Sequence, residues 1–148
     1  MKIFPGIHLV FGLTGLLIFI PIEIMRHSAF DFNIHDTYFV VSSWHVSMAV
    51  FFIFQFFAFI YYGFAKMFRP LGKKLAGLHY GLTTLTIVLF FILPYLMNGL
   101  PRRITPEDGM MNSMKTINLL ITINALLFVS AQLLFFINVG ITIFKKRI

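Results

Sequence analysis

Long apolar stretches alternate with short polar ones along the chain. Four apolar segments cover roughly residues 4–24, 38–64, 75–97 and 117–144. Each is long enough to cross the core of a bilayer, which takes about 20 helical residues. Lipid offers the backbone no hydrogen bonds, and a closed barrel needs more strands than these, so the segments are predicted to be helices. The pattern predicts an all-α integral membrane protein with four transmembrane helices in a single domain, residues 1–148.

Basic residues are concentrated in some of the polar stretches. The two ends of the chain and the connection over residues 65–74 carry Lys2, Lys66, Arg69, Lys73, Lys74, Lys145, Lys146 and Arg147. The other two connections, residues 25–36 and 98–116, carry Arg26, Arg102, Arg103 and Lys115, with all five carboxylates in or near them. Cytoplasmic loops hold the excess of lysine and arginine. We therefore expect a multi-pass protein of the cytoplasmic membrane with both termini in the cytoplasm.

Composition supports this topology and removes several classes of function. Hydrophobic residues make up 59% of the chain, against about 45–50% in a soluble domain. The net charge of +7 lies in clusters between apolar segments, so it indicates membrane topology and no nucleic-acid partner. There is no cysteine, so a disulfide, a thiolate metal site and a covalently attached c-type heme are excluded.

One histidine lies inside an apolar segment. His45 is five to seven residues past the outer end of the second predicted helix, or about 8–10 Å into the apolar zone. At helical spacing it shares a face with Met48, Phe52, Gln55 and Phe59. An ionisable side chain is costly in lipid and indicates function by default. Two interpretations stay open, a heme iron ligand and a structural hydrogen bond to a neighbouring helix.

Two further features on the outer side bear on that choice. Trp44 and the many aromatic residues around it suit a flat macrocycle, although such residues also serve simple packing. The vicinal pair Arg102 and Arg103 suits the carboxylates of heme propionates. The same arginines could instead lie in a solvated loop, paired with Glu107 and Asp108.

Two other histidines lie near the cytoplasmic side. His8 and His79 are each predicted about one turn inside the cytoplasmic end of a helix, at the wrong depth to join His45. They could pack or cap helices, or together ligate a second heme on the cytoplasmic side.

Small residues and amides are predicted to join the helices to one another. Gly12 and Gly15, and the pair Gly77 and Gly81, would let helix backbones approach closely. Amides recur along the last apolar segment at Asn118, Asn124, Gln132 and Asn138. We predict that these amides form interhelical hydrogen bonds worth about 1 kcal/mol or less each.

The chain resembles subunit I of the heme–copper oxidases. Residues 35–41, His-Asp-Thr-Tyr-Phe-Val-Val, followed by Trp44 and His45, resemble the tenth helix of that subunit, where the family shows HDTY(F/Y)VVAHFH. In chain order, residues 12–15 resemble the ninth helix, residues 78–80 and 99–104 the eleventh helix with its GMPRR loop, and the last apolar segment the twelfth. The resemblance covers nearly the whole chain but only the last third of the oxidase subunit.

This resemblance implies roles for individual residues. His45 matches the axial ligand of the low-spin heme, and Arg102 and Arg103 match the arginines that hold heme propionates. His35 and Asp36 match a pair near a magnesium ion beside those propionates, a site that also uses another subunit.

The chain also departs from the family pattern. Ser43 stands where the family has the proximal ligand of the high-spin heme. The three copper-binding histidines and the second axial ligand of the low-spin heme belong to earlier helices, which this sequence does not contain. The spacing after His45 is about two residues shorter than in the family. Because serine is not a usual heme ligand and no histidine cluster remains for copper, we do not expect this chain alone to reduce oxygen.

The function we expect is therefore electron transfer by half of a low-spin heme site. One heme, of type b or a, would lie near the outer face on His45 with Trp44 against it, and a quinol or a redox protein would exchange electrons with it. A second copy of the chain or another respiratory subunit would supply the other imidazole. The alternatives are a cofactor-free structural or assembly subunit of a respiratory complex, or one piece of a split oxidase.

Overall fold

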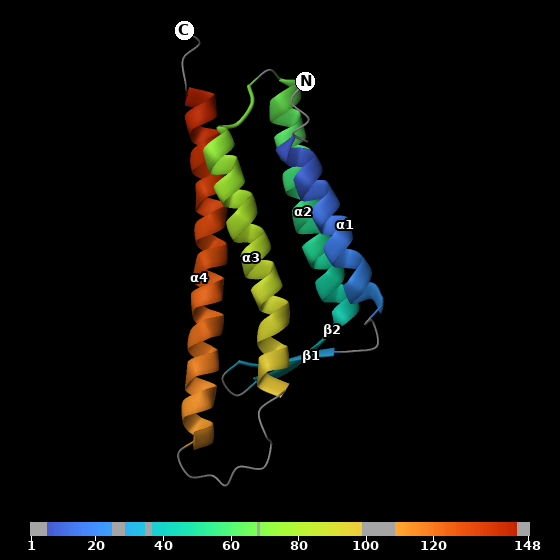
Figure 1. Ribbon diagram of the computed structural model, residues 1–148, viewed down its shortest axis with the longest axis vertical. Helices are drawn as coiled ribbons and strands as arrows, with labels where there is room; N and C mark the ends of the chain where they lie inside the picture. Colours follow the sequence, from blue (N-terminus) through green and yellow to red (C-terminus); the bar gives the residue numbers. More distant parts are fainter. Residues whose placement is uncertain (1–5, 25–28, 35–36, 68, 99–108, 145–148) are drawn as a thin grey trace. The chain divides into compact units, whose positions relative to one another are not determined.

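The structure of the chain is a computed structural model that describes residues 6–24, 29–34, 37–67, 69–98 and 109–144, with the side chains of residues 6–20, 40–67, 69–93 and 119–144. Its elements are, in chain order, α1 (Ile7–Ile24), β1 (Ala29–Ile34), β2 (Thr37–Ser42), α2 (Ser43–Lys66), α3 (Lys73–Asn98) and α4 (Gly109–Phe144) (Figure 1). The chain divides into two compact units. The first unit, Met1–Leu71, holds α1, α2 and both strands, and the second unit, Gly72–Ile148, holds α3 and α4.

Each predicted apolar segment contains one helix. Within the described ranges, the stretches long and apolar enough to cross a membrane are Ser43–Lys66, Lys73–Leu93 and Leu119–Phe144, and α1 contributes a shorter apolar stretch, Ile7–Ile20. The predicted helical, multi-pass membrane protein is thereby confirmed. The side of the membrane on which the termini lie stays a prediction.

The first unit is built on an antiparallel helix pair with an aromatic core. Phe11 of α1 is fully buried. Its ring stacks on that of Tyr61 at 5.4 Å between centroids and lies 5.9 Å from Phe54 and 5.8 Å from Phe57, all three on α2. Large rings of this kind dominate the packing energy of a helix interface, so this cluster holds α1 to α2.

Gly15 of α1 lets α2 come close, as predicted, whereas a Cβ atom added at Gly12 would make only ordinary contacts at 3.7 and 3.8 Å. A Cβ atom added at Gly15 would lie 2.7 Å from the Cβ of Phe54, closer than two such atoms can approach. One turn earlier, Nε2 of Gln55 donates a hydrogen bond to the backbone oxygen of Gly12 at 3.1 Å. The side of α1 that carries Gly12 and Gly15 thus packs against the large side chains of Phe54 and Gln55 on α2.

The two strands form an antiparallel hairpin that the sequence analysis did not predict. Residues Ala29 to Ile34 pair with Ser42 back to Thr37, one for one. The prediction that residues 38–42 belong to the second helix is therefore wrong, and α2 begins at Ser43. The physical reason is the composition of Thr37–Ser42, because its β-branched and aromatic residues favour a pleated strand over a helix. The strictly all-α prediction is corrected to four helices and one hairpin among the described residues.

The second unit is an antiparallel pair joined by polar contacts. Near the start of α3, the backbone nitrogen of Gly72 donates to Oδ1 of Asn138 at 2.8 Å, and Nδ2 of Asn138 donates to the oxygen of Gly72 at 3.1 Å. Farther along the pair, Nδ2 of Asn124 donates to the backbone oxygen of Thr86 at 3.0 Å. The predicted interhelical bonds of Asn124 and Asn138 are confirmed. Asn118 lies in α4, but its side chain is outside the described residues.

The other predicted packing feature of α3 does not join the helices of this unit. Gly77 and Gly81 are exposed, and a Cβ atom added at either would meet no described atom within 4 Å. The face of α3 toward α4 carries Ala76, His79 and Thr83, all buried. The prediction that the glycine pair brings α3 against a partner helix is therefore wrong for α4.

Candidate functional site

His45 is the third residue of α2, directly beyond the hairpin. The last residue of β2 is Ser42 and the first residue of α2 is Ser43, so no connecting residue separates strand from helix. Two residues of helix amount to about 3 Å of axial rise. The predicted depth of 8–10 Å is therefore too large, because it counted β2 as helix. His45 lies at the very end of the helix pair.

The helix directs His45 away from α1. The buried residues of α2 form one stripe, and its three aromatic members pack on Phe11 of α1. The stripe consists of Ser43, Ser47, Val50, Phe54, Phe57 and Tyr61. His45 lies off that stripe and is exposed. No hydrogen bond joins its imidazole to another described residue. Within the described part of the first unit the alternative of a structural hydrogen bond thus has no support, and His45 is exposed as a residue.

The face predicted around His45 is partly corrected. Phe52 and Phe59 share it, at 63% and 76% exposure. Gln55 does not, because its amide turns to the backbone of Gly12 on α1 and is partly buried there. The exposed surface next to His45 is consequently aromatic, and the one amide of this stretch is used in helix packing.

Trp44 is held by α1 on one side and is open on the other. Its ring lies 6.2 Å from that of Phe19, whose own ring lies 5.3 Å from that of Phe51. The side chain of Trp44 keeps 37% of its surface exposed. An indole at the first turn of a membrane helix is typical of the aromatic belt at the bilayer surface. The predicted packing of Trp44 against a heme stays a prediction.

The far end of α2 carries matching surface markers that the sequence analysis did not use. Tyr62 is exposed, and Nζ of Lys66 lies 5.6 Å from the centre of its ring. Eighteen residues separate Trp44 from Tyr62, or about 27 Å of helix, close to the thickness of a hydrocarbon core. An aromatic residue followed by lysine one turn later at the end of an apolar segment was the available signal.

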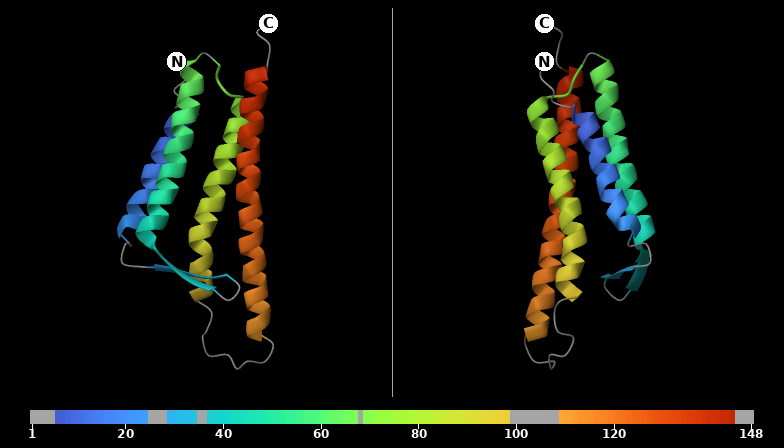
Figure 2. Two further views of the ribbon diagram at one scale, coloured as in Figure 1. Left: turned by 180° about the vertical axis from the view of Figure 1, so that it is seen from behind. Right: turned by 45° about the vertical axis from the view of Figure 1, so that its right-hand side comes forward.

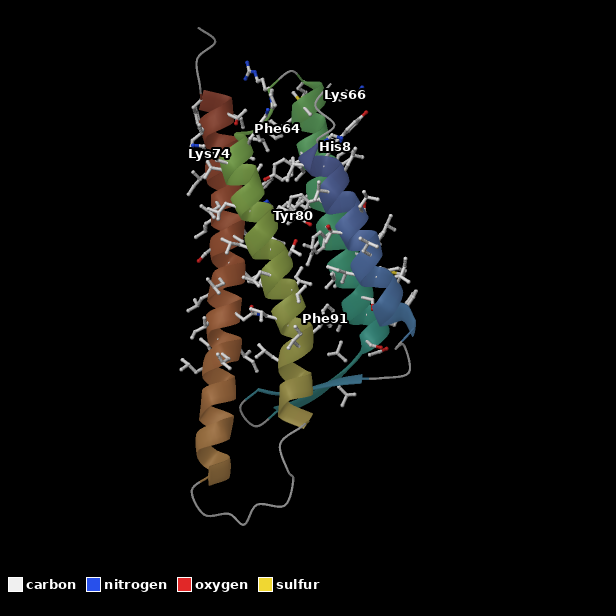
Figure 3. All side chains as sticks on the ribbon, in the orientation of Figure 1. His8, Phe64, Lys66, Lys74, Tyr80 and Phe91 are labelled. Atoms are coloured by element: carbon white, nitrogen blue, oxygen red, sulfur yellow. The ribbon has the colours of Figure 1, made fainter. Side chains whose placement is uncertain are left out.

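His8 lies at the opposite end of the first unit from His45. Its ring lies 5.5 Å from that of Tyr62, and Figure 3 shows it beside Lys66, away from the hairpin. Tyr62 is seventeen residues beyond His45, which places His8 about 25 Å away along the helix axis. The predicted mismatch in depth between His8 and His45 is confirmed, and these two histidines of one chain do not share a metal.

His79 is a packing residue of the second unit. It is fully buried, its Nε2 lies 3.3 Å from Oε1 of Gln132, and its ring lies 5.3 Å from that of Phe135. The contact with Gln132 is also the interhelical bond predicted for that amide. The packing interpretation of His79 is the one that these contacts support, rather than a second heme on the cytoplasmic side.

Ser43 belongs to the buried stripe of α2. It is 1% exposed, and its backbone oxygen accepts a hydrogen bond from Oγ of Ser47 at 2.7 Å. The side chain at this position is therefore buried, on a different face of α2 from the exposed His45.

The remaining predicted site residues lie outside the described residues, namely Arg102, Arg103, His35 and Asp36. In the part of the chain that the structure describes, no group of three or more His, Cys, Asp or Glu side chains could hold a metal ion. The predicted magnesium site has no support from the described residues. What they offer is one exposed imidazole, which fits one of the two axial positions of a heme iron.

Comparison with known proteins gives a consistent result. Residues 3–127 match the family model described as "Cytochrome C and Quinol oxidase polypeptide I". Cytochrome c oxidase subunit 1 of Synechocystis sp. is 32% identical over 137 residues, which cover 90% of this chain and 23% of that protein. The Bacillus sp. subunit 1 is 31% identical over 140 residues, covering 90% and 21%. The subunit 1 of Thermostichus vulcanus is 32% identical over 112 residues, covering 74% and 20%.

The chain thus spans about a fifth of the length of these curated relatives. No solved structure matches it.

Proposed function

The chain belongs to the cytochrome c and quinol oxidase polypeptide I family, and from this premise we propose that it binds one low-spin heme through His45 and transfers electrons. The observation that carries the proposal is the exposed imidazole of His45 in the first turn of α2. The family resemblance assigns an axial iron ligand to this position. An imidazole committed to helix packing, as at His79, would argue against that role, and His45 is not so committed.

One imidazole is half of the ligand set. Low-spin, electron-transferring heme sites use a ligand on each side of the porphyrin. His8 is about 25 Å away along the helix axis, so the first unit does not supply a second imidazole. We propose that another chain supplies it, either a second copy related by a two-fold axis or another respiratory subunit.

The residues around His45 would each contribute to holding the group. Phe52 and the open side of Trp44 offer aromatic surface next to the imidazole. Arg102 and Arg103 would bind the propionates, and their positive charge would raise the reduction potential. A heme of type b or a would supply one-electron chemistry, with a quinol or a redox protein as the exchange partner.

The proposal does not extend to oxygen reduction by this chain alone. The residue at the position of the high-spin heme ligand is Ser43, which is buried and is not a usual heme ligand. The distribution of basic residues supports cytoplasmic termini and an outer position for His45, in the cytoplasmic membrane.

The second candidate function is that of one piece of a split oxidase, or of a cofactor-free structural or assembly subunit of a respiratory complex. In that case His45 would contact a neighbouring subunit of the complex.

The two candidate functions are distinguished by whether the purified protein contains heme. The protein is expressed in heme-replete cells, purified, and measured as a dithionite-reduced minus oxidised spectrum, with pyridine extraction to name the heme type. We expect sharp low-spin bands that His45→Ala abolishes while the protein stays in the membrane. His8→Ala is the matched control, since it removes a histidine from the other end of the same unit and should keep the bands. Unchanged bands in His45→Ala would overturn the assignment, and a colourless parent protein would support the second candidate.

A further inference from the structure

Two cations lie at the end of α2 that points away from the hairpin of the first unit (Figures 1 and 2). Lys66 is the last residue of the helix. The backbone nitrogen of Arg69 donates to the oxygen of Phe64 at 3.2 Å, and this bond holds Arg69 at the last helical turn. Both basic residues are exposed. One cation offsets the partial negative charge of a helix C-terminus, so the two together leave an excess of positive charge.

The described residues hold no counterion for this pair. The acidic residues of the first unit are Glu23, Asp31 and Asp36. Glu23 is in the last turn of α1 and Asp31 is in β1, both at the opposite end of the helix pair, and Asp36 lies outside the described residues. The described residues of the second unit include no acidic one. Accordingly, no ion pair joins Lys66 or Arg69 to a described residue.

Tyr62 places the ammonium group of Lys66 at the level of lipid headgroups. Nζ of Lys66 lies 5.6 Å from the centre of the tyrosine ring, and the ring of His8 meets the same ring edge-on at 5.5 Å. A tyrosine at the end of a membrane span is typical of the headgroup level. The part of α2 that leads to it exposes Phe59 and Phe56, at 76% and 59% exposure. Cations at the surface next to an exposed aromatic face in the acyl region suit the two parts of a phospholipid.

We propose that Lys66 and Arg69 bind the phosphate of an anionic phospholipid, with an acyl chain of that lipid along Phe59. The ammonium and guanidinium groups donate charge-assisted hydrogen bonds to phosphate oxygens, and the ring of Tyr62 attracts and orients the lysine. A zwitterionic headgroup brings its own cation, so the site favours a headgroup with net negative charge, such as phosphatidylglycerol. The inference does not depend on heme binding.

The test measures which lipid lies beside this end of α2. Trp44, the single tryptophan of the chain, is replaced by Phe, and Phe59→Trp introduces a reporter about one turn from Tyr62. The full chain is placed in phosphatidylcholine vesicles that contain a small fraction of phosphatidylglycerol brominated on its acyl chains. A parallel sample contains the same fraction of brominated phosphatidylcholine. The ratio of the two quenching efficiencies measures the preference for the anionic headgroup.

Two double variants of the reporter chain remove the same charge from different units. Lys66→Gln with Arg69→Gln removes the proposed site. Lys73→Gln with Lys74→Gln is the matched control, because both lysines are exposed in the first turn of α3, in the second unit. We expect brominated phosphatidylglycerol to quench the parent reporter about threefold more strongly than brominated phosphatidylcholine. The first double variant should lower that ratio to about one, and the second should leave it above about two.

Three results overturn the proposal. Equal quenching by the two lipids in the parent reporter chain means that another partner, such as an acidic protein segment, balances these cations. A ratio that falls equally in both double variants, or in neither, means that no site exists at Lys66 and Arg69. Loss of the preference in sodium phosphate, but not in sodium chloride of equal ionic strength, assigns the cations to free phosphate. Phe56→Trp, on the same exposed part of α2, gives the readout if Phe59→Trp disturbs folding.

Discussion

Asn138 binds both backbone polar groups of Gly72, accepting from its nitrogen at 2.8 Å and donating to its oxygen at 3.1 Å. Gly72 directly precedes α3, and its oxygen also accepts from the nitrogen of Ala76 at 2.9 Å. A side chain of α4 therefore completes the first turn of α3. Asn138 is 1% exposed whereas Gly72 is exposed, so both bonds are partly buried.

Replacing Asn138 by Leu, which has nearly the same shape, should destabilise the second unit by about 1–2 kcal/mol, since two interhelical bonds are lost and the groups of Gly72 lose their partner. The chain has no cysteine, so spin labels on Leu78→Cys and Leu133→Cys can report the separation of α3 and α4 during a titration from mild detergent into sodium dodecyl sulfate. Ser130→Ala is the control, since Oγ of Ser130 bonds only within its own helix, to the oxygen of Leu126 at 2.8 Å. A midpoint for Asn138→Leu no lower than that of the control would contradict this account.

The same substitution at Asn124 should cost much less. Nδ2 of Asn124 donates to the oxygen of Thr86, but its Oδ1 is buried and has no hydrogen-bond partner among the described residues. Asn124→Leu removes one bond and also removes one unsatisfied buried oxygen, and these effects oppose each other. We expect a change within about 0.5 kcal/mol in the same titration. A loss as large as that of Asn138→Leu would mean that Oδ1 has a partner we have not identified.

Gly15→Ala should separate α1 from α2. The added methyl group would lie 2.7 Å from the Cβ of Phe54, so the helices must shift, at a cost of about 1–3 kcal/mol. The fluorescence of Trp44, the single tryptophan of the chain, is measured as the reporter, because its ring lies 6.2 Å from that of Phe19 across the pair. Gly63→Ala is the control in the same pair, where an added methyl group meets no described atom within 4 Å. Identical thermal transitions for the two variants would show that the approach at Gly15 is not tight.

If a second copy completes the site of His45, each heme should be shared by two chains. Pyridine extraction set against amino-acid analysis then gives about one heme for two chains, and the His45→Ala variant should fail to retain heme and lose any heme-dependent dimer in mild detergent. A ratio of about one heme for one chain, with no partner protein present, would contradict the shared site.

The sequence predicted the helices well because each is a long apolar run, and lipid leaves the backbone no alternative to a helix. It failed at the start of α2, where Tyr38–Val41 continues the apolar run without a break. Periodicity cannot separate a short apolar strand from the first turn of a buried helix. The depth of His45 carried the same error, since it was counted from that boundary.

The sequence predicted which side chains form interhelical hydrogen bonds, but it did not predict the residues they bond to. The bonding role of Asn138 followed from the scarcity of partners in lipid, yet its partner depends on the register of α3 against α4. That register is set by the shapes of many side chains between α3 and α4, so no single position of the sequence determines it. Gln55 shows the same limit. Helical spacing predicted it on the face of His45, but its amide donates a hydrogen bond to the backbone oxygen of Gly12 on α1.

The junction of Ser42 and Ser43 makes the hairpin a lever on the first turn of α2. No connecting residue separates the strand from the helix. A rotation of the strands therefore also rotates the first turn of α2, which carries His45. A change in the direction of the strands thereby changes the orientation of its imidazole ring at the end of the helix.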